Sequence, residues 1–184
     1  MNNDSQRTHD AWLALRCQHG DAAAFGELVA EFERPLAYFV AKIIGDQDAA
    51  WDVLQLVWIR VFRHIRRLES PEQVRAWLYE IAHGIAIDQL RKRDSIRRIE
   101  KEYAEQNAEA DVEPNFDTGD TVAIHRALDE MDLRLREVLT LHFLEDMSVA
   151  EVSKIVGSPE GTVKSRLYHA RQDLRERLKG MNHD

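Results

Sequence analysis

The segment GSPEGTVKSRLYHAR, residues 157–171, combines cationic, hydroxyl and aromatic side chains at the spacing of an α-helix. Val163, Leu167 and Ala170 recur every three or four residues, which predicts an inward apolar stripe that Leu174 continues. The opposite face then carries small, polar and aromatic side chains with basic ones beside them. Cations contact DNA phosphates, whereas hydroxyl, imidazole and phenol groups reach base edges. We therefore expect DNA contacts from Gly161, Thr162, Lys164, Ser165, Arg166, Tyr168, His169 and Arg171.

A shorter helix is predicted immediately before this one. Ser148 and Glu151 have the spacing of a capping box, and Gly157 suits the residue that ends a helix. The pair Ser158-Pro159 is a start signal for the next helix. Two helices joined by a turn of about three residues that contains Gly form a helix-turn-helix. The alternative is an ordinary helical hairpin whose polar face is only solvated.

Charge is segregated along the chain, although the whole protein has a net charge of −8. Residues 60–98 hold 10 basic and 5 acidic side chains, and residues 148–184 hold 7 and 5. Residues 99–147, between them, hold 4 basic and 14 acidic side chains. Two basic blocks on either side of an acidic one suit a protein that meets a polyanion at two places. The other interpretation is that these charges lie on solvated helix faces.

The helix expected around residues 53–65 has more apolar side chains than one buried stripe needs. Nine of its positions are apolar, so the apolar surface extends far round the helix. Either this helix is central to its domain, or its second face binds a partner.

Boundary signals separate four helices in the first half of the chain, at about 9–18, 21–44, 46–67 and 71–93. Gly45-Asp46 separates the second helix from the third. Ser70 and Gln73 have the spacing of a capping box, with Pro71 suited to the first turn of the fourth helix.

The stretch 102–120 is rich in acids and has few large apolar side chains, so it predicts a flexible linker. The expected fold is all-α, with two small helical domains and the helix-turn-helix in the second. Its parts are an N-terminal segment over 1–20, a domain over 21–98, an acidic linker over 99–120 and a C-terminal domain over 121–180.

Composition excludes several classes of protein. The single cysteine, Cys17, excludes an internal disulfide framework and fits a reducing compartment. No apolar run approaches the length of about 18 residues that a membrane span needs. The first residues, MNNDSQRTHD, lack the apolar core of a secretory signal. We expect a soluble, cytoplasmic protein.

An enzyme is disfavoured by the motifs. Glu80 and His83 have the Glu-x-x-His spacing of di-metal helical bundles, but the chain has no second copy of that motif. His142 and Glu145 stand in the reverse order. A Gly-rich phosphate loop, a paired-cysteine motif and a Ser-His-Asp arrangement are also missing from the sequence. We expect no catalytic residue, metal or cofactor.

Four segments together resemble one family. MSVAEVSKIVGSPEGTVKSRLYHARQDLRERL, residues 147–178, resembles the C-terminal domain of extracytoplasmic-function (ECF) sigma factors of RNA polymerase. AAAFGELVAEFERPLAYFVAKIIGD at 22–46, AWDVLQLVWIRVFRHI at 50–65 and VRAWLYEIAHGIAIDQLRKR at 74–93 resemble that family's N-terminal domain, in the family's order. The resemblance implies an alternative sigma factor, which takes polymerase core to specific promoters and helps to open them without nucleotide hydrolysis.

The resemblance also implies partners and their contact residues. The C-terminal helix would read the upstream promoter element as duplex, while the N-terminal domain would hold the melted downstream element. The downstream contacts would be Arg66, Arg67, Arg75, His83, Arg91, Lys92 and Arg93. The core-polymerase contacts would be Asp52, Gln55, Leu56, Trp58, Ile59 and Arg60. An anti-sigma factor, membrane-anchored or soluble, would hold the free protein inactive.

The sequence departs from the family pattern at five positions. Trp51 and Leu56 stand where the family usually has acids. Glu80, His83 and Gly84 stand where it commonly has two basic residues and Asn. A rival hypothesis remains, a stand-alone helix-turn-helix regulator that dimerises or senses a ligand through its first half. Such a regulator would bind duplex DNA alone, whereas a sigma factor selects promoters only with core polymerase.

Overall fold

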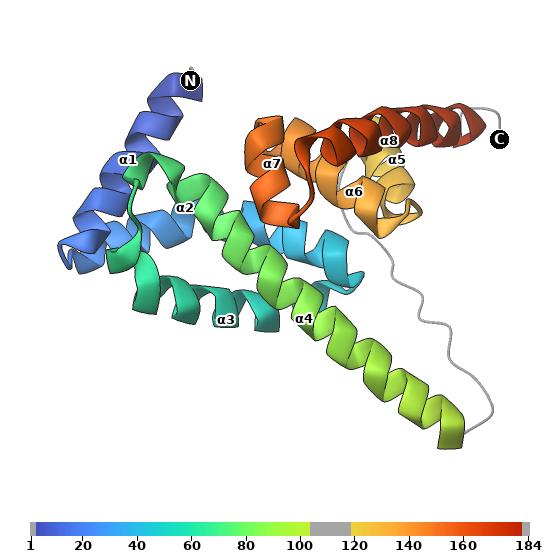
Figure 1. Cartoon of the computed structure of the whole chain (residues 1–184), viewed down its shortest axis with the longest axis horizontal. Helices are drawn as coiled ribbons and strands as arrows, with labels where there is room; N and C mark the ends of the chain where they lie inside the picture. The colour runs from blue at the N-terminus through green and yellow to red at the C-terminus, as the bar shows by residue number, and fades with distance from the viewer. Residues whose placement is uncertain (1–2, 104–118, 182–184) are drawn as a thin grey trace.

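A computed structural model describes residues 3–103 and 119–181, with side chains described over 4–96 and 123–179. Every regular element in these ranges is helical (Figure 1). The first half consists of α1 (Asn3–Gln18), α2 (Ala22–Ile44), α3 (Gln47–His64) and α4 (Val74–Tyr103). The second half consists of α5 (Gly119–Asp129), α6 (Leu133–Leu139), a π-helical turn η3 (Thr140–Leu144), α7 (Val149–Val156) and α8 (Glu160–Met181). The predicted all-α fold is confirmed.

Local capping explains the boundary between α2 and α3. The carboxylate of Asp21 accepts hydrogen bonds from the backbone N–H groups of Ala23 and Ala24 at the start of α2. Gly45 ends that helix with φ of 71°, a left-handed conformation that glycine adopts without a Cβ penalty. Asp46 then caps α3 by accepting from Ala49 N–H. The predicted break at Gly45-Asp46 is confirmed.

The start and the end of α4 differ from the prediction. Ser70 makes no side-chain capping bond, so the predicted capping box at Ser70 and Gln73 is wrong. The Gln73 N–H instead bonds the Ser70 carbonyl in a 3₁₀ turn, η2 (Pro71–Gln73), and α4 begins after it. At the other end α4 continues past residue 93, because no Gly or Pro interrupts residues 85–103. A second 3₁₀ turn, η1 (Ile65–Arg67), follows α3.

Most of the predicted linker lies outside the residues that the structure describes. Residues 104–118 of the stretch 99–120 are not among the described residues, whereas 99–103 belong to α4.

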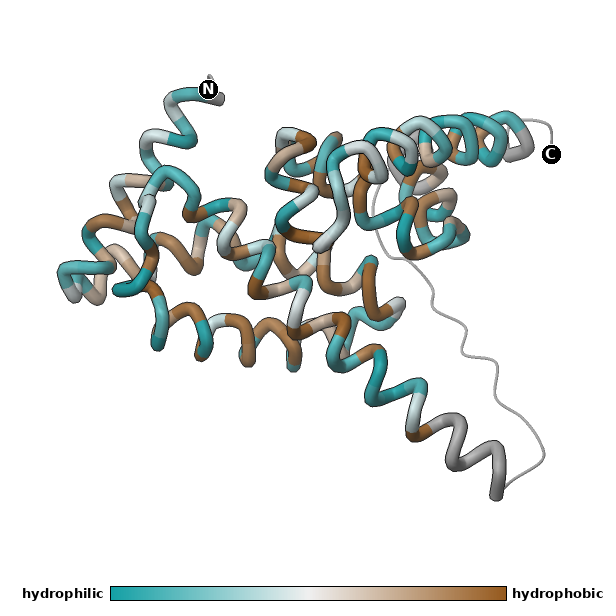
Figure 2. The backbone as a smooth tube through the Cα atoms, viewed as in Figure 1, coloured by the Kyte–Doolittle hydropathy of each residue, from teal (hydrophilic) through white to brown (hydrophobic). Residues whose placement is uncertain are grey.

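Each half buries a helical core. In the first half, Leu28 and Phe32 of α2 pack with Val57 of α3 and Leu78 of α4, all of them nearly inaccessible to solvent. In the second half, the predicted stripe on α8 is confirmed. Val163, Leu167 and Ala170 are buried, and Leu174 is half-buried. Figure 2 shows apolar residues concentrated between the helices. Burial of such stripes is the main term that holds amphipathic helices together.

The two halves pack against each other, which the sequence did not predict. Helix α7 lies against α4 and α6 lies against α2 (Figure 1). One buried apolar cluster runs through both halves and includes Leu78 of α4 together with Val152 and Ile155 of α7. Within the described ranges, no helix is both long and apolar enough to span a bilayer.

Candidate nucleic-acid interface

Helices α7 and α8 form the predicted helix-turn-helix. The Ser148 hydroxyl accepts from Glu151 N–H, while the Glu151 carboxylate accepts from Ser148 N–H at 2.7 Å, so the predicted capping box of α7 is confirmed. Gly157 ends α7 in the left-handed conformation, with φ of 62°. The Ser153 hydroxyl donates to the Ser158 carbonyl at 2.6 Å and ties the turn to α7. This turn fixes the direction of α8 relative to α7.

Most of the side chains predicted to contact DNA are exposed on α8. The exposed set consists of Gly161, Thr162, Lys164, Ser165, Tyr168, His169 and Arg171. Tyr168 is 58% exposed, and it accepts a hydrogen bond from the Gln172 amide at 2.9 Å. A Cβ atom at Gly161 would meet no atom within 4 Å, so packing inside the protein does not require glycine there. Its small size leaves the helix surface open at this position.

Arg166 is the exception on this helix. Its guanidinium lies 3.5 Å from a carboxylate oxygen of Glu137 on α6, and only 20% of its side chain is exposed. Glu137 is itself 7% exposed. Arg166 is therefore held by the protein and does not stand in solvent like Lys164.

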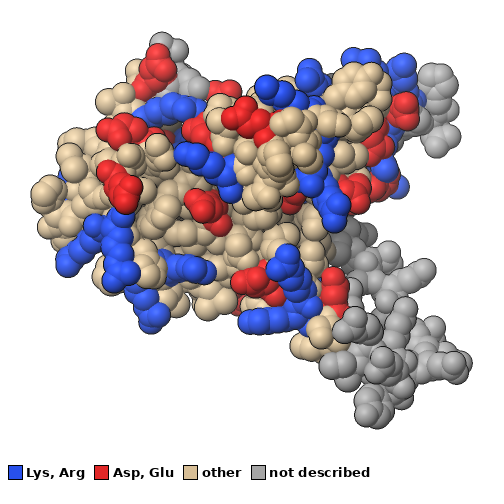
Figure 3. Space-filling view, viewed as in Figure 1, with Lys and Arg blue, Asp and Glu red and all other residues tan. Residues whose placement is uncertain are grey.

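The residues predicted to contact the downstream element do not form one patch. Arg66 and Arg67 lie exposed on η1, whereas Arg91 and Lys92 lie exposed far along α4. Arg93 is half-buried, 3.9 Å from Asp46. In Figure 3 basic side chains gather along the lower edge of the molecule, over α3 and along α4.

Two further members of that predicted set have partners inside the protein. Arg75 contacts the buried carboxylate of Asp10 at 3.2 Å, and its guanidinium stacks over the Phe32 ring. His83 Nε2 lies 3.1 Å from the Glu137 carboxylate, and its side chain is 13% exposed. Both side chains are positioned by packing contacts in this arrangement.

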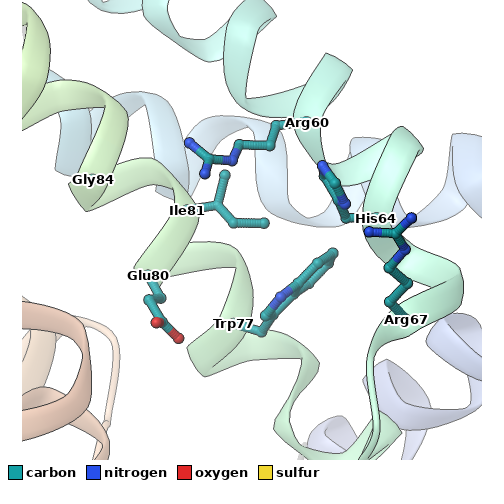
Figure 4. Close-up of a pocket in the computed structure, with 7 residues that line it drawn as sticks. All are labelled: Arg60, His64, Arg67, Trp77, Glu80, Ile81 and Gly84. Carbon is teal, nitrogen blue, oxygen red and sulfur yellow. The ribbon is translucent and has the colours of Figure 1, made fainter.

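A pocket of about 390 Å³ opens between α3 and α4 (Figure 4). From α3 and η1 come three potentially cationic side chains, Arg60, His64 and Arg67. From α4 come Trp77, Ile81, Glu80 and Gly84. An aromatic face beside cations is the combination that stacks an unpaired base and neutralises its phosphates.

Of the residues that line the pocket, the predicted downstream set contains only Arg67, and His64 and Trp77 are among those it missed. A signal for them was present, because positions 60, 64 and 67 share one helix face, as do 77, 81 and 84. That the two faces meet is a property of the tertiary structure.

The two faces of the apolar helix α3 differ in burial. Its inner face is buried through Val53, Leu54, Val57 and others. Its outer face exposes a stripe of large apolar side chains, Trp51, Leu56, Ile59 and Phe62, with exposed fractions of 44–68%. Figure 2 shows that α3 has many hydrophobic residues along its length. The helix is thus central to its domain, as one of the two alternatives predicted, and it also exposes a large apolar surface on its other face.

The predicted polymerase contacts lie along or beside this outer face. Asp52, Gln55, Leu56, Ile59 and Arg60 are exposed. Trp58 is half-buried, in an edge-to-face contact with Phe25 at 6.1 Å between ring centroids.

Among the residues that the structure describes, no group of three or more His, Cys, Asp or Glu side chains is placed to hold a metal ion. Glu80 lines the pocket, whereas His83 on the same helix contacts Glu137. Burial raises the pKa of the Cys17 thiol, and the side chain is packed in the core.

Comparisons with known proteins place two family regions on the chain. Sigma-70 region 2 matches residues 28–96, and sigma-70 region 4 matches residues 121–174. The RNA polymerase sigma factor SigV of Bacillus subtilis is 33% identical over 135 residues, which cover 73% of this chain and 79% of SigV. The ECF RNA polymerase sigma-E factor of Escherichia coli is 28% identical over 181 residues, 92% of this chain and 94% of that protein.

Two solved structures are also similar to this chain. CnrH, in complex with the cytosolic domain of CnrY, superimposes with a TM-score of 0.67 at 25% identity, covering 94% of this chain and 98% of CnrH. The sigma factor RpoE of Bartonella quintana, in complex with the anti-sigma factor NepR, gives a TM-score of 0.71 at 24% identity. That match covers 84% of this chain and 96% of RpoE.

Proposed function

The chain belongs to the extracytoplasmic-function family of RNA polymerase sigma factors, and we propose that it directs core polymerase to specific promoters and helps to open them. The observation that carries this proposal is the order of regions 2 and 4 along one chain, at residues 28–96 and 121–174. The protein acts in the cytoplasm as an initiation factor. We expect it to do so without a catalytic residue, metal or cofactor of its own.

Helix α8 reads the upstream promoter element in the major groove. Lys164 and Arg171 are exposed beside the polar face and neutralise phosphates. Ser165, Tyr168 and His169 face the base edges. The domain extends over residues 121–180, and the acidic segment 99–120 joins it to the first domain.

The first domain, residues 21–98, holds the melted downstream element as single-stranded DNA. The pocket between α3 and α4 takes one unstacked base against Trp77, with Arg67 beside it for a phosphate. Arg66, Arg91, Lys92 and Arg93 track the DNA backbone further along the domain.

The outer face of α3 docks on core polymerase. It offers a large exposed apolar surface with polar groups at its edge, which is the composition of an interface core with a rim. Trp51 and Leu56 stand where the family pattern usually has acids, and both add exposed apolar surface to this face. An anti-sigma factor that binds the same face would keep the free protein from polymerase.

Promoter binding with and without polymerase tests this function against the stand-alone regulator. A fluorescent promoter fragment with a melted downstream element is titrated with the protein alone and with the protein plus sigma-free core polymerase. We expect sequence-specific binding only when both proteins are present. Tight specific binding to fully duplex DNA by the protein alone, unchanged by core polymerase, would favour the regulator.

A further inference from the structure

Phe143 lies at the surface of the π-helical turn η3, although its side chain is large and apolar. The side chain is 48% exposed. The Arg171 guanidinium of α8 lies over its ring, with 5.5 Å between the guanidinium carbon and the ring centroid. A cation at this distance over an aromatic face is attracted by the negative charge of that face. Phe143 is therefore in contact with one of the side chains predicted to bind DNA.

The backbone that carries Phe143 is held on both sides. Leu141 is fully buried, and Glu145 is 8% exposed. The His142 ring donates from Nδ1 to the Met147 carbonyl at 2.6 Å and so ties the turn to the residues that follow it. A π-helical turn is rare in proteins and is often found at a functional site. The exposed ring thus stands on a fixed support.

The two flanks of α8 differ in how their cations are paired. Arg166 and Arg177, on one flank, pair with carboxylates of the second half. At about 100° per residue, Lys164, Arg171 and Arg175 lie on the other flank, and all three are exposed. Among the described residues, no carboxylate forms an ion pair with these three. Their charges are therefore available to the phosphates of a bound duplex.

An aromatic partner leaves more of an arginine free than a carboxylate does. A carboxylate neutralises the guanidinium charge and accepts its N–H groups. An aromatic ring attracts the flat face of the guanidinium, while the N–H donors lie in the plane of the group and point outward. Arg171 is thus oriented without being neutralised. A side chain that is already oriented loses less conformational entropy when it binds a phosphate.

We propose that Phe143 is a positioning residue, which orients Arg171 toward a phosphate of the upstream promoter element. The inference rests on the proposed function, because it assumes that α8 binds this element. Arg171 lies on a flank of the helix and not at the centre of its polar face, so its contact is with the DNA backbone. Phe143 acts through Arg171 and increases affinity for any upstream sequence.

The substitution Phe143→Leu tests this role, because it removes the ring face and keeps an apolar side chain. The complex of each variant with sigma-free core polymerase is titrated with promoter DNA. We expect Phe143→Leu to weaken binding about 2–5-fold, without a change in base preference. Phe143→Tyr keeps the ring face and should bind like the wild type. Leu144→Ala, at a neighbouring position that is 47% exposed, is the control and should also bind like the wild type.

A double-mutant cycle shows whether Phe143 acts through Arg171. Arg171→Ala alone should lower the slope of log K against log salt concentration by about one. In that background Phe143→Leu should cause no further loss of affinity. Arg175→Ala is the matched background, because Arg175 lies on the same flank about one helical turn further on. There Phe143→Leu should still weaken binding about 2–5-fold.

Two results would overturn the positioning role. One is an equal loss from Phe143→Leu in the presence and absence of Arg171, and the other is a Phe143→Tyr variant that binds DNA as weakly as Phe143→Leu. Affinity for core polymerase without DNA is measured in parallel and should not change. Its loss in both Phe143→Leu and Leu144→Ala would identify these side chains as a protein-docking surface instead.

The wild-type complex separates a failure of this inference from a failure of the proposed function. If it binds promoters specifically but the cycle shows no coupling between Phe143 and Arg171, the positioning role is wrong and the sigma-factor function stands. If the wild-type protein gives no promoter-specific binding with polymerase, the function is wrong and the positioning role falls with it.

Discussion

Lys164 and His169 are both exposed on α8, but we expect them to contact different parts of the DNA. A lysine ammonium is a compact charge at the end of a flexible chain and contacts phosphates without regard to sequence. An imidazole has a directional donor and acceptor that reach base edges. Lys164 should therefore contribute to affinity for any promoter, and His169 to the choice of promoter sequence.

Replacing Lys164 by alanine should weaken binding of the polymerase complex to all promoters alike. Loss of one phosphate contact lowers the slope of log K against log salt concentration by about one. Titrations at several salt concentrations measure this slope. His169→Ala is the comparison, and it should shift base preference in the upstream element by about 1–3 kcal/mol. The assignment of the recognition face is wrong if His169→Ala leaves that preference unchanged.

Replacing Trp77 by alanine should weaken capture of the melted strand. Stacking of a base on an aromatic ring contributes about 1–3 kcal/mol, so affinity for a template with an unpaired downstream element should fall by roughly 5–150-fold. Binding of the upstream duplex by the same complex should not change. Trp12→Ala removes an equally large side chain, 51% exposed on α1, and is the control. Equal effects of the two substitutions would contradict the role of the pocket.

At the scale of elements, short α7 depends on its cap. A helix of eight residues gains little from propensity alone, so its capping box and its packing on α4 decide its stability. Ser148→Ala should lower the free energy of unfolding by about 1 kcal/mol in urea titrations. Ser165→Ala, at an exposed position of α8, should change it by less than about 0.5 kcal/mol. Equal losses of unfolding free energy in the two variants would show that the cap does not stabilise the protein.

The ionisation of Glu151 makes the stabilisation by this cap depend on pH. Burial opposes its ionisation, but hydrogen bonds from Ser148 and the Arg7 charge outweigh that effect and lower the pKa of the carboxyl. A lowered pKa in the folded state stabilises the protein above the ordinary value of 4.5, and this contribution is lost as the pH falls through the lowered value. Wild type should therefore be more stable than Glu151→Gln at pH 7, and the difference should shrink as the pH falls below 4.5. A difference independent of pH would contradict this explanation.

Local signals predicted elements well where the deciding contacts are local. The Asp21, Asp46 and Ser148 caps bond residues two or three positions away, so the sequence contains both partners. The expected box at Ser70 failed because a 3₁₀ turn satisfied the same backbone group with the Ser70 carbonyl. The helical stripe of α8 and its exposed face followed from periodicity alone.

The contacts that local patterns did not predict join distant parts of the chain. Tyr79 and Glu145 are 66 residues apart, and His83 and Glu137 are 54 residues apart. No periodicity or capping rule links such positions. The pocket between α3 and α4 and the contact between the two halves were therefore visible only in the structure.

Although the whole molecule is acidic, its exposed apolar face on α3 and the exposed basic side chains of α8 lie in different places. Ile59→Asp, at a position 49% exposed on α3, should reduce affinity for core polymerase at least tenfold without unfolding the protein, since a charge at an interface core is poorly solvated. Leu15→Asp on α1, 46% exposed, should have little effect. Surface plasmon resonance with immobilised core polymerase measures the affinity of both variants. An equal loss in the two variants would point to a nonspecific effect of the added charge.

Transcription in vitro distinguishes a sigma factor from a stand-alone regulator. The purified protein and sigma-free core polymerase are combined on a template that carries the promoter upstream of the protein's own gene. A discrete transcript that requires both proteins is the predicted result. No transcript, together with a footprint on duplex DNA in the absence of polymerase, would contradict the claim and identify a stand-alone regulator.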